Sequence, residues 1–132
     1  MKVLIVQHES FEAPGAICEW VTSRGHACSI VSLYAGERCP RDVSDAGLLV
    51  VMGGPQSPST STEECNHFDA KAEISLIRRY IDAGRSVVGV CLGAQLIGEA
   101  LGAHYEHSPH REIGVFPISL TASGLEDPYF KD

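Results

Sequence analysis

The sequence has 132 residues, the size of one small domain, so we expect a single compact unit over residues 1–132. Hydrophobic residues make up 44% and charged residues 20%, which is typical of a folded globular protein and not of a disordered chain. Lys and Arg total 10 against 17 Asp and Glu, for a formal net charge of −7. This acidic balance disfavours nucleic acid and anionic membranes as partners, and no apolar stretch approaches the roughly 20 residues of a membrane-spanning helix.

Apolar runs and helix-breaking residues predict alternating strands and helices. Continuous apolar runs are typical of parallel strands buried on both faces, and apolar residues at helical spacing indicate amphipathic helices. Trp20, at helical spacing with Ile17, is expected in the core. The predicted elements, in chain order, are a strand at 2–7, a helix opened by Pro14 and ended by Gly25, strands at 28–33 and 47–52, a loop at 56–66, a helix at 68–83, a strand at 86–90, a helix at 94–101 and one or two strands at 112–121.

This order of elements predicts an α/β protein with three layers, in which helices cover both faces of a mainly parallel sheet. Ligands of such sheets bind beyond the carboxyl ends of the strands. Gly53 and Gly54 follow the third predicted strand, and Cys91 follows the fourth. We therefore expect these three residues at the same edge of the sheet.

The cysteines show no pattern of a disulfide framework or a zinc site. There are five of them, none in a CxxC pair or at another spacing typical of zinc ligands. An odd number without an export signal indicates reduced thiols and a cytoplasmic protein. We expect no metal and no cofactor. Small apolar or loop positions are expected for four of the five, namely Cys18, Cys28, Cys39 and Cys65.

The segment around Cys91 has the pattern of a nucleophile elbow, which is a strand, then G-x-C-x-G, then a helix. Such a turn projects the nucleophile from the sheet, and Gly89 and Gly93 leave room where the backbone segments approach each other. The turn places Cys91 at a helix N-terminus, which favours the thiolate. The N–H of Leu92 would face the oxygen of any carbonyl that Cys91 attacks. The alternative is a buried cysteine that lies between two glycines by chance.

A Gly-Gly pair ends the third predicted strand. Gly53 and Gly54 let the backbone turn so that an N–H points into a site, and together with the N–H of Leu92 this would make an oxyanion hole with two donors. The alternative is an ordinary tight turn before a loop.

These segments together resemble the class I, or triad, glutamine amidotransferases, and within them the branch that is similar to the glutaminase domain of GMP synthase. The residues that carry the resemblance, which extends over nearly the whole chain, are Gly53-Gly54-Pro55, the run from Gly89 to Gln95, Ala100-Leu101-Gly102 and Glu112-Ile113-Gly114. The resemblance implies a flavodoxin-like fold. It also implies that Cys91 attacks the side-chain amide of glutamine, forms a glutamyl thioester and releases ammonia. The acceptor of that ammonia would belong to another domain or subunit.

The resemblance also assigns site residues and exposes one departure. Gly53 and Leu92 would supply the oxyanion amides, and Gly54 and Gln95 would contact the glutamine. The family's catalytic His and Glu form a His-Pro-Glu-like pair well downstream of the nucleophile, and no such pair occurs here. We therefore expect the chain to correspond to the N-terminal portion of the domain, with a sheet incomplete at its C-terminal end and little glutaminase activity of its own.

Two other functions stay open at this point. The same thiol could hydrolyse γ-glutamyl peptides, or the chain could be a non-catalytic domain that binds glutamine or a partner. An exposed sheet edge also leaves homo-oligomerisation open. Exposed loop positions are expected for two groups of polar residues, namely His104, His107 and His110, and Glu63, Glu64 and His67.

Overall fold

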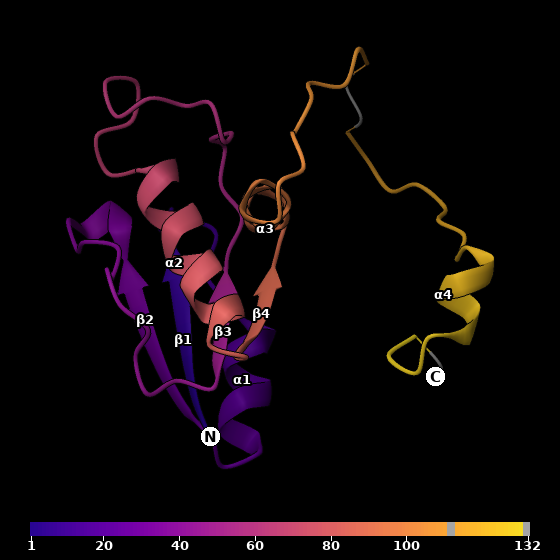
Figure 1. Cartoon of the computed structure of the whole chain (residues 1–132), viewed down its shortest axis with the longest axis horizontal. Helices are drawn as coiled ribbons and strands as arrows, with labels where there is room; N and C mark the ends of the chain where they lie inside the picture. Colours follow the sequence, from indigo (N-terminus) through magenta and orange to yellow (C-terminus); the bar gives the residue numbers. More distant parts are fainter. Residues whose placement is uncertain (111–112, 131–132) are drawn as a thin grey trace.

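The structure is a computed structural model, and it describes residues 1–110 and 113–130 (Figure 1). Four parallel strands form one sheet in the order β2-β1-β3-β4. Their bounds are β1 (Lys2–Gln7), β2 (Ala27–Ser32), β3 (Leu48–Val51) and β4 (Ser86–Gly89). Each of the four predicted strands up to residue 90 is present, and no strand end differs from the prediction by more than one residue.

Helices cover both faces of this sheet, as predicted. The helices are α1 (Ala16–Ser23), α2 (Ala70–Asp82), α3 (Leu92–Ala100) and α4 (Ala122–Glu126), and a 3-10 turn, η1 (Leu33–Ala35), follows β2. Strand β1 lies inside the sheet, and its alternate side chains enter two separate cores. Leu4 and Val6 pack with α2 and α3, whereas Val3 and Ile5 pack with Val21 of α1. Both faces of β1 are therefore buried, which explains its continuous apolar run.

Helix α2 is the largest contributor to the first of these cores. Ile77 and Tyr80 are fully buried, and the Tyr80 hydroxyl hydrogen-bonds Ser44 Oγ at 2.8 Å. The helix begins at an N-cap, where the Asp69 carboxylate accepts a hydrogen bond from the Ala72 N–H at 3.0 Å. It ends before Gly84, which adopts a left-handed φ of 67°.

The segment after α3 differs from the prediction. Residues 113–121 contain no strand, whereas α4 at 122–126 was not predicted; Glu112 lies outside the described residues. Ile113, Val115 and Ile118 are 84%, 102% and 92% exposed. A strand needs a neighbour for its backbone hydrogen bonds, and this segment extends away from the sheet (Figure 1). The alternating pattern of its apolar residues was therefore not enough to make it a strand.

Trp20 is also not in the core, contrary to the prediction. Its side chain is 48% exposed, and it packs against other residues at the end of α1. The Arg24 guanidinium lies 4.9 Å from the ring centroid, and the His26 ring meets it edge-on at 6.5 Å. Helical spacing placed Trp20 near the buried stripe but not on it. No helix in the described part of the chain is long and apolar enough to cross a membrane.

Candidate active site

Cys91 lies between β4 and α3 in a strained backbone conformation. Its φ is 50° and its ψ is −106°, and it is the one non-glycine residue with a positive φ among residues 1–110 and 113–130. A non-glycine residue rarely adopts such a φ, and residues that do so cluster at functional sites. Cys91 is also exposed and occupies the N-cap of α3. The helix therefore begins two residues earlier than predicted, directly after the cysteine.

The glycines on either side of Cys91 are required by close backbone contacts. A Cβ on Gly89 would overlap the backbone of Gly93 and Ala94, and a Cβ on Gly93 would overlap the carbonyl group of Val51. The first turn of α3 therefore lies directly against the ends of β3 and β4. This is the steric reason that the sequence analysis gave for the G-x-C-x-G spacing.

Gly53 lies beside Cys91, as the strand order predicted. A Cβ on Gly53 would be 3.5 Å from Cys91 Cβ and 2.5 Å from a carboxylate oxygen of Glu12. A Cβ on Gly54 would approach Leu92 to 3.1 Å and would overlap the side-chain oxygen of Gln56. The Gly-Gly pair is thus packed between the start of α3 and the segment after β1.

The backbone amides of Gly53 and Leu92 are available at this edge of the sheet. Leu92 is the first residue of α3, so its N–H has no partner within the helix. We find no hydrogen bond from either amide to another described residue. Two unpaired N–H groups next to an exposed thiol are the donors that an oxyanion hole needs.

A buried pair of ionisable side chains contacts the backbone of Gly53 through its carbonyl oxygen. His8, which follows β1, is completely buried, and Glu73 of α2 is 1% exposed. His8 Nδ1 lies 3.0 Å from the carbonyl oxygen of Gly53, and His8 Nε2 lies 2.8 Å from Glu73 Oε2. The two contacts use opposite ring nitrogens, so a doubly protonated His8 donates to both acceptors.

The protonated form of His8 is the one that these contacts favour. Burial alone lowers the pKa of His8, and it is the largest single effect. The hydrogen bond and the negative charge of Glu73, together with the Gly53 carbonyl, outweigh it, so the pKa of His8 is raised above its ordinary value. His8 therefore connects α2 to the peptide of Gly53 through charge-assisted hydrogen bonds.

His8, Glu12 and Glu73 were not predicted as site residues from the sequence. No spacing rule links His8 to Glu73, because the two are 65 residues apart and meet only when α2 covers the sheet. The remaining site residue, Gln95, lies one turn after Cys91 and is exposed. It borders a cavity of about 370 Å³ that is also lined by residues of the segment after α3, Ala103 to Glu106.

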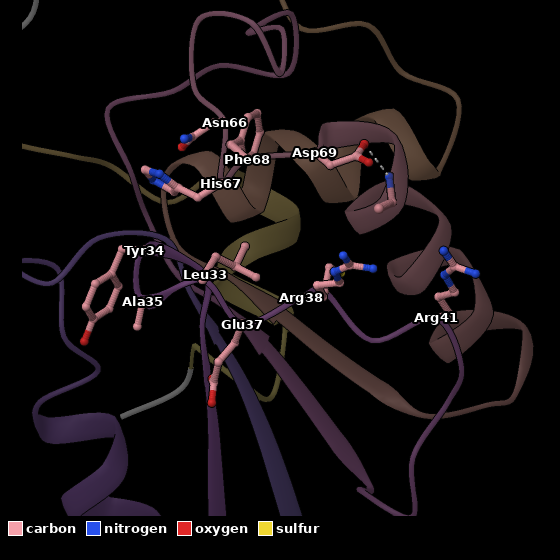
Figure 2. Close-up of a pocket in the computed structure, with 13 residues that line it drawn as sticks. Leu33, Tyr34, Ala35, Glu37, Arg38, Arg41, Asn66, His67, Phe68 and Asp69 are labelled. Carbon is pink, nitrogen blue, oxygen red and sulfur yellow. Dashed lines mark hydrogen bonds between the residues drawn. The ribbon is translucent and has the colours of Figure 1, made fainter.

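A larger cavity, of about 690 Å³, lies at the other side of the same sheet edge (Figure 2). Its lining comes from residues 33–41 after β2 and from residues 66–69 before α2, and it does not include Cys91. We place the candidate active site at Cys91 because the strained turn and the unpaired amides are there. His104, His107 and His110 are exposed, as are Glu63 and Glu64, which agrees with the sequence analysis. His67 is half-buried and contacts Glu9, so it is not on a solvated loop surface.

The chain belongs to the class-I glutamine amidotransferase family. The model of that family matches residues 13–127. The chain is 52% identical over 128 residues to the glutamine amidotransferase-like protein YfeJ of Salmonella typhimurium, a match that covers 97% of this chain and 54% of YfeJ. It is 33% identical over 93 residues to the imidazole glycerol phosphate synthase subunit HisH of Aquifex aeolicus, covering 67% of this chain and 41% of HisH. It is 31% identical over 117 residues to the GMP synthase of S. typhimurium, covering 85% of this chain and 20% of that protein.

Solved structures agree with this assignment and with a flavodoxin-like fold. The crystal structure of SMU.1228c matches with a TM-score of 0.95 and 48% identity, and the match covers all of this chain and 56% of the other. A glutamine amido transferase from Methylobacillus flagellatus matches with a TM-score of 0.75 and 28% identity, over 86% of this chain and 43% of the other. The chain thus spans about half the length of YfeJ and of SMU.1228c.

Replacement of Gly93 by Ala is expected to destabilise the protein by several kcal/mol, because the new methyl group would overlap the Val51 carbonyl. Gly98, in the same helix, is the matched control. A Cβ there would be 3.9 Å from its nearest neighbour, so Gly98→Ala should be neutral or stabilising by up to about 1 kcal/mol. Urea unfolding of both variants checks this. If Gly93→Ala and Gly98→Ala were equally stable, the close contact between Gly93 and the Val51 carbonyl would be refuted.

Replacement of Glu73 by Ala should lower the free energy of unfolding by about 3–5 kcal/mol, because it leaves His8 buried without its partner. Glu73→Gln keeps an acceptor for His8 and should cost less. Glu63→Ala, on the exposed loop, is the control and should stay within about 0.5 kcal/mol of the unchanged chain. A Glu73→Ala variant as stable as the control in urea would contradict the role given to the buried pair.

Proposed function

We propose that this chain carries the nucleophile and the oxyanion hole of a class I glutamine amidotransferase. Cys91 would attack the side-chain amide carbon of glutamine, forming a glutamyl thioester and releasing ammonia, and water would then release glutamate. The observation that carries the proposal is the positive φ of an exposed cysteine at a helix N-terminus, held between two glycines that have no room for a side chain.

The oxyanion of the tetrahedral intermediate would be held by the N–H groups of Gly53 and Leu92. Both belong to residues packed around Cys91, and neither amide hydrogen-bonds another described residue. Loss of one such donor typically lowers kcat by about 10²–10³. The contact from His8 to the Gly53 carbonyl supports this arrangement, because it fixes the plane of the peptide that follows Gly53 and anchors the turn in which the Gly53 N–H lies.

The substrate and the acceptor are also part of the proposal. Gln95 and Gly54 would contact the bound glutamine. Gln95 lies one helical turn after Cys91, and a Cβ on Gly54 would be 3.1 Å from the side chain of Leu92, which directly follows the cysteine. Ammonia would pass to an acceptor bound by a synthase domain or subunit, as the names of HisH and GMP synthase imply for those relatives. No cofactor takes part in this chemistry.

No histidine or carboxylate in the described ranges hydrogen-bonds Cys91, and His8 is turned toward Gly53 and Glu73. We propose that full turnover needs a His–carboxylate pair next to Cys91. The two pairs in the described residues, His8–Glu73 and His67–Glu9, do not hydrogen-bond this thiol. Alkylation of Cys91 by a diazoketone analogue of glutamine does not need this pair, because the thiol proton passes to the diazo carbon and N₂ leaves as the thioether forms. The reaction therefore isolates the role of the elbow.

A diazoketone analogue of glutamine should label Cys91 and none of the other four cysteines. Excess glutamine should slow the labelling, and the chain alone should release little ammonia from glutamine. Intact-mass and peptide mass spectrometry measure the extent and the position of labelling. Gly53→Ala should slow the reaction at least about tenfold, because a methyl group there would approach Glu12 and Cys91 and displace one oxyanion donor.

Two controls make this test specific. Cys39→Ser, which changes a thiol away from the elbow, should label at the unchanged rate, and Cys91→Ser should not label at all. Protection by γ-glutamyl peptides but not by glutamine would favour the peptidase alternative. Labelling spread over several cysteines, without protection by either compound, would refute Cys91 as the nucleophile.

A further inference from the structure

A second cluster of reactive side chains lies at the carboxyl end of β1, apart from Cys91. Glu9 follows β1, and Cys65 and His67 lie at the end of the loop before α2. Among the described residues, these three alone bring a carboxylate, a thiol and an imidazole within 4.8 Å of one another. All three are partly buried, with the His67 and Glu9 side chains 26% and 16% exposed.

The thiol and the carboxylate of this cluster share one ring nitrogen of His67. His67 Nε2 lies 3.0 Å from Glu9 Oε1 and 3.4 Å from Cys65 Sγ. Cys65 Sγ is farther from the other ring nitrogen, Nδ1, at 3.7 Å, so the carboxylate and the thiol both lie nearest to the same nitrogen. That nitrogen can carry only one proton. A catalytic relay would instead place the thiol and the carboxylate on opposite nitrogens, as the general template requires. The cluster is therefore not a second Cys–His–Glu triad.

The same distances fit three ligands of one metal ion. Bonds of about 2.0 Å to nitrogen and oxygen and about 2.3 Å to sulfur place tetrahedral ligand atoms roughly 3.3–3.5 Å apart. The 3.0 Å and 3.4 Å separations are close to this range. A thiolate, an imidazole and a carboxylate together are typical of zinc, whereas Mg²⁺ and Ca²⁺ take oxygen ligands.

Gln56 is a fourth residue that contacts this cluster. Its Nε2 is 2.6 Å from Glu9 Oε1 and 3.4 Å from Cys65 Sγ, while its Oε1 is buried and has no hydrogen-bond partner in the described part of the chain. A half-turn of the amide would exchange the two atoms and point Oε1 at the ion. The unsatisfied oxygen is thus explained if the amide faces a cation.

We propose that Glu9, Cys65 and His67 bind a zinc-class divalent cation, with the Gln56 side-chain oxygen as fourth ligand. Binding would displace the proton of the Cys65 thiol to solvent and move the proton of His67 to Nδ1, so that Sγ and Nε2 are free to bind the ion. The ion would join the end of β1 to the loop that begins with Gly53 and Gly54. Its role would be structural, because four protein ligands leave no open position.

Two of the other thiols are partly buried in surroundings that disfavour the thiolate. Burial, followed by the negative charges of Glu73 and Asp69, raises the pKa of Cys39 to about 12. Burial and the neighbouring Cys18 raise the pKa of Cys28 to about 11.

Cobalt is the probe for this site, because Co²⁺ replaces Zn²⁺ and is coloured. The test uses the chain with Cys91→Ser, so that the exposed thiol cannot contribute, after treatment with a chelator and a thiol-free reductant. We expect one equivalent of Co²⁺ to give visible bands of a tetrahedral ion and a near-ultraviolet thiolate charge-transfer band. One equivalent of Zn²⁺ should abolish both.

Three further substitutions decide which residues bind the ion. Cys65→Ser should remove the charge-transfer band, and His67→Gln should weaken Co²⁺ binding by at least about tenfold. Cys39→Ser is the matched control, because Cys39 is also a half-buried cysteine next to α2. This substitution should change neither the charge-transfer band nor the affinity for Co²⁺. Zn²⁺ should raise the Tm of the control and not that of Cys65→Ser.

Several results would overturn the proposal. One is a charge-transfer band that survives Cys65→Ser, and another is a band that disappears with Cys18→Ser instead. The proposal would also be overturned if neither Co²⁺ nor Zn²⁺ showed saturable binding at about 100 µM metal ion. The Tm of each metal-free variant shows whether it is folded, and if Cys65→Ser is unfolded, His67→Gln alone decides the outcome. None of these measurements depends on the chemistry of Cys91.

Discussion

The close approach of α3 to the ends of β3 and β4 is the constraint on which the candidate site depends. Gly93 packs on the Val51 carbonyl, and Gly89 packs on the backbone of Gly93. With both contacts made, the chain can pass from strand to helix only by a turn so sharp that Cys91 takes a positive φ. The strain is local, and the packing of α3 on the first core, through the buried Leu92 and Leu96, compensates for it.

A second constraint acts from the opposite side of Gly53. The His8–Glu73 pair is buried, and burial of two charged groups is costly unless their hydrogen bonds are satisfied. Here one of the two Glu73 oxygens has no partner in the described ranges, so the pair does not reach the full complement. A well-packed apolar pair would serve the core at least as well. We therefore interpret the pair as a support for the backbone of Gly53, whose carbonyl oxygen is the second hydrogen-bond partner of His8.

Most of the fold and part of the site could be predicted from the sequence. The strands from β1 to β4 are continuous apolar runs because helices cover both faces of the sheet, and α2 carries its buried residues in one stripe. Four residues at the candidate site could be found because each one reflects a local requirement of the backbone. They are Gly53, Gly89, Cys91 and Gly93. The roles of these residues in catalysis stay a proposal, as do those of Gly54, Leu92 and Gln95.

The remaining features depend on contacts that local patterns do not encode. His8 and Glu73 lie far apart in the sequence and are paired only by the packing of α2 on β1. The cluster of Glu9, Cys65 and His67 also combines two distant segments, so its cysteine shows none of the spacings that mark a zinc site. The predictions for Trp20 and for residues 113–121 were wrong for a different reason. Periodicity indicates how a segment could pack, but it does not show whether a partner surface is present.

The central claim is that the strained turn at Cys91 and the amides beside it form one acyl-transfer site. The most direct test is a crystal structure of the chain after Cys91 has reacted with an electrophilic glutamine analogue that keeps its carbonyl group. The account predicts that the carbonyl oxygen of the adduct lies within hydrogen-bond distance of both the Gly53 and the Leu92 amide nitrogens. An adduct whose oxygen points into solvent, with both amides unengaged, would contradict it.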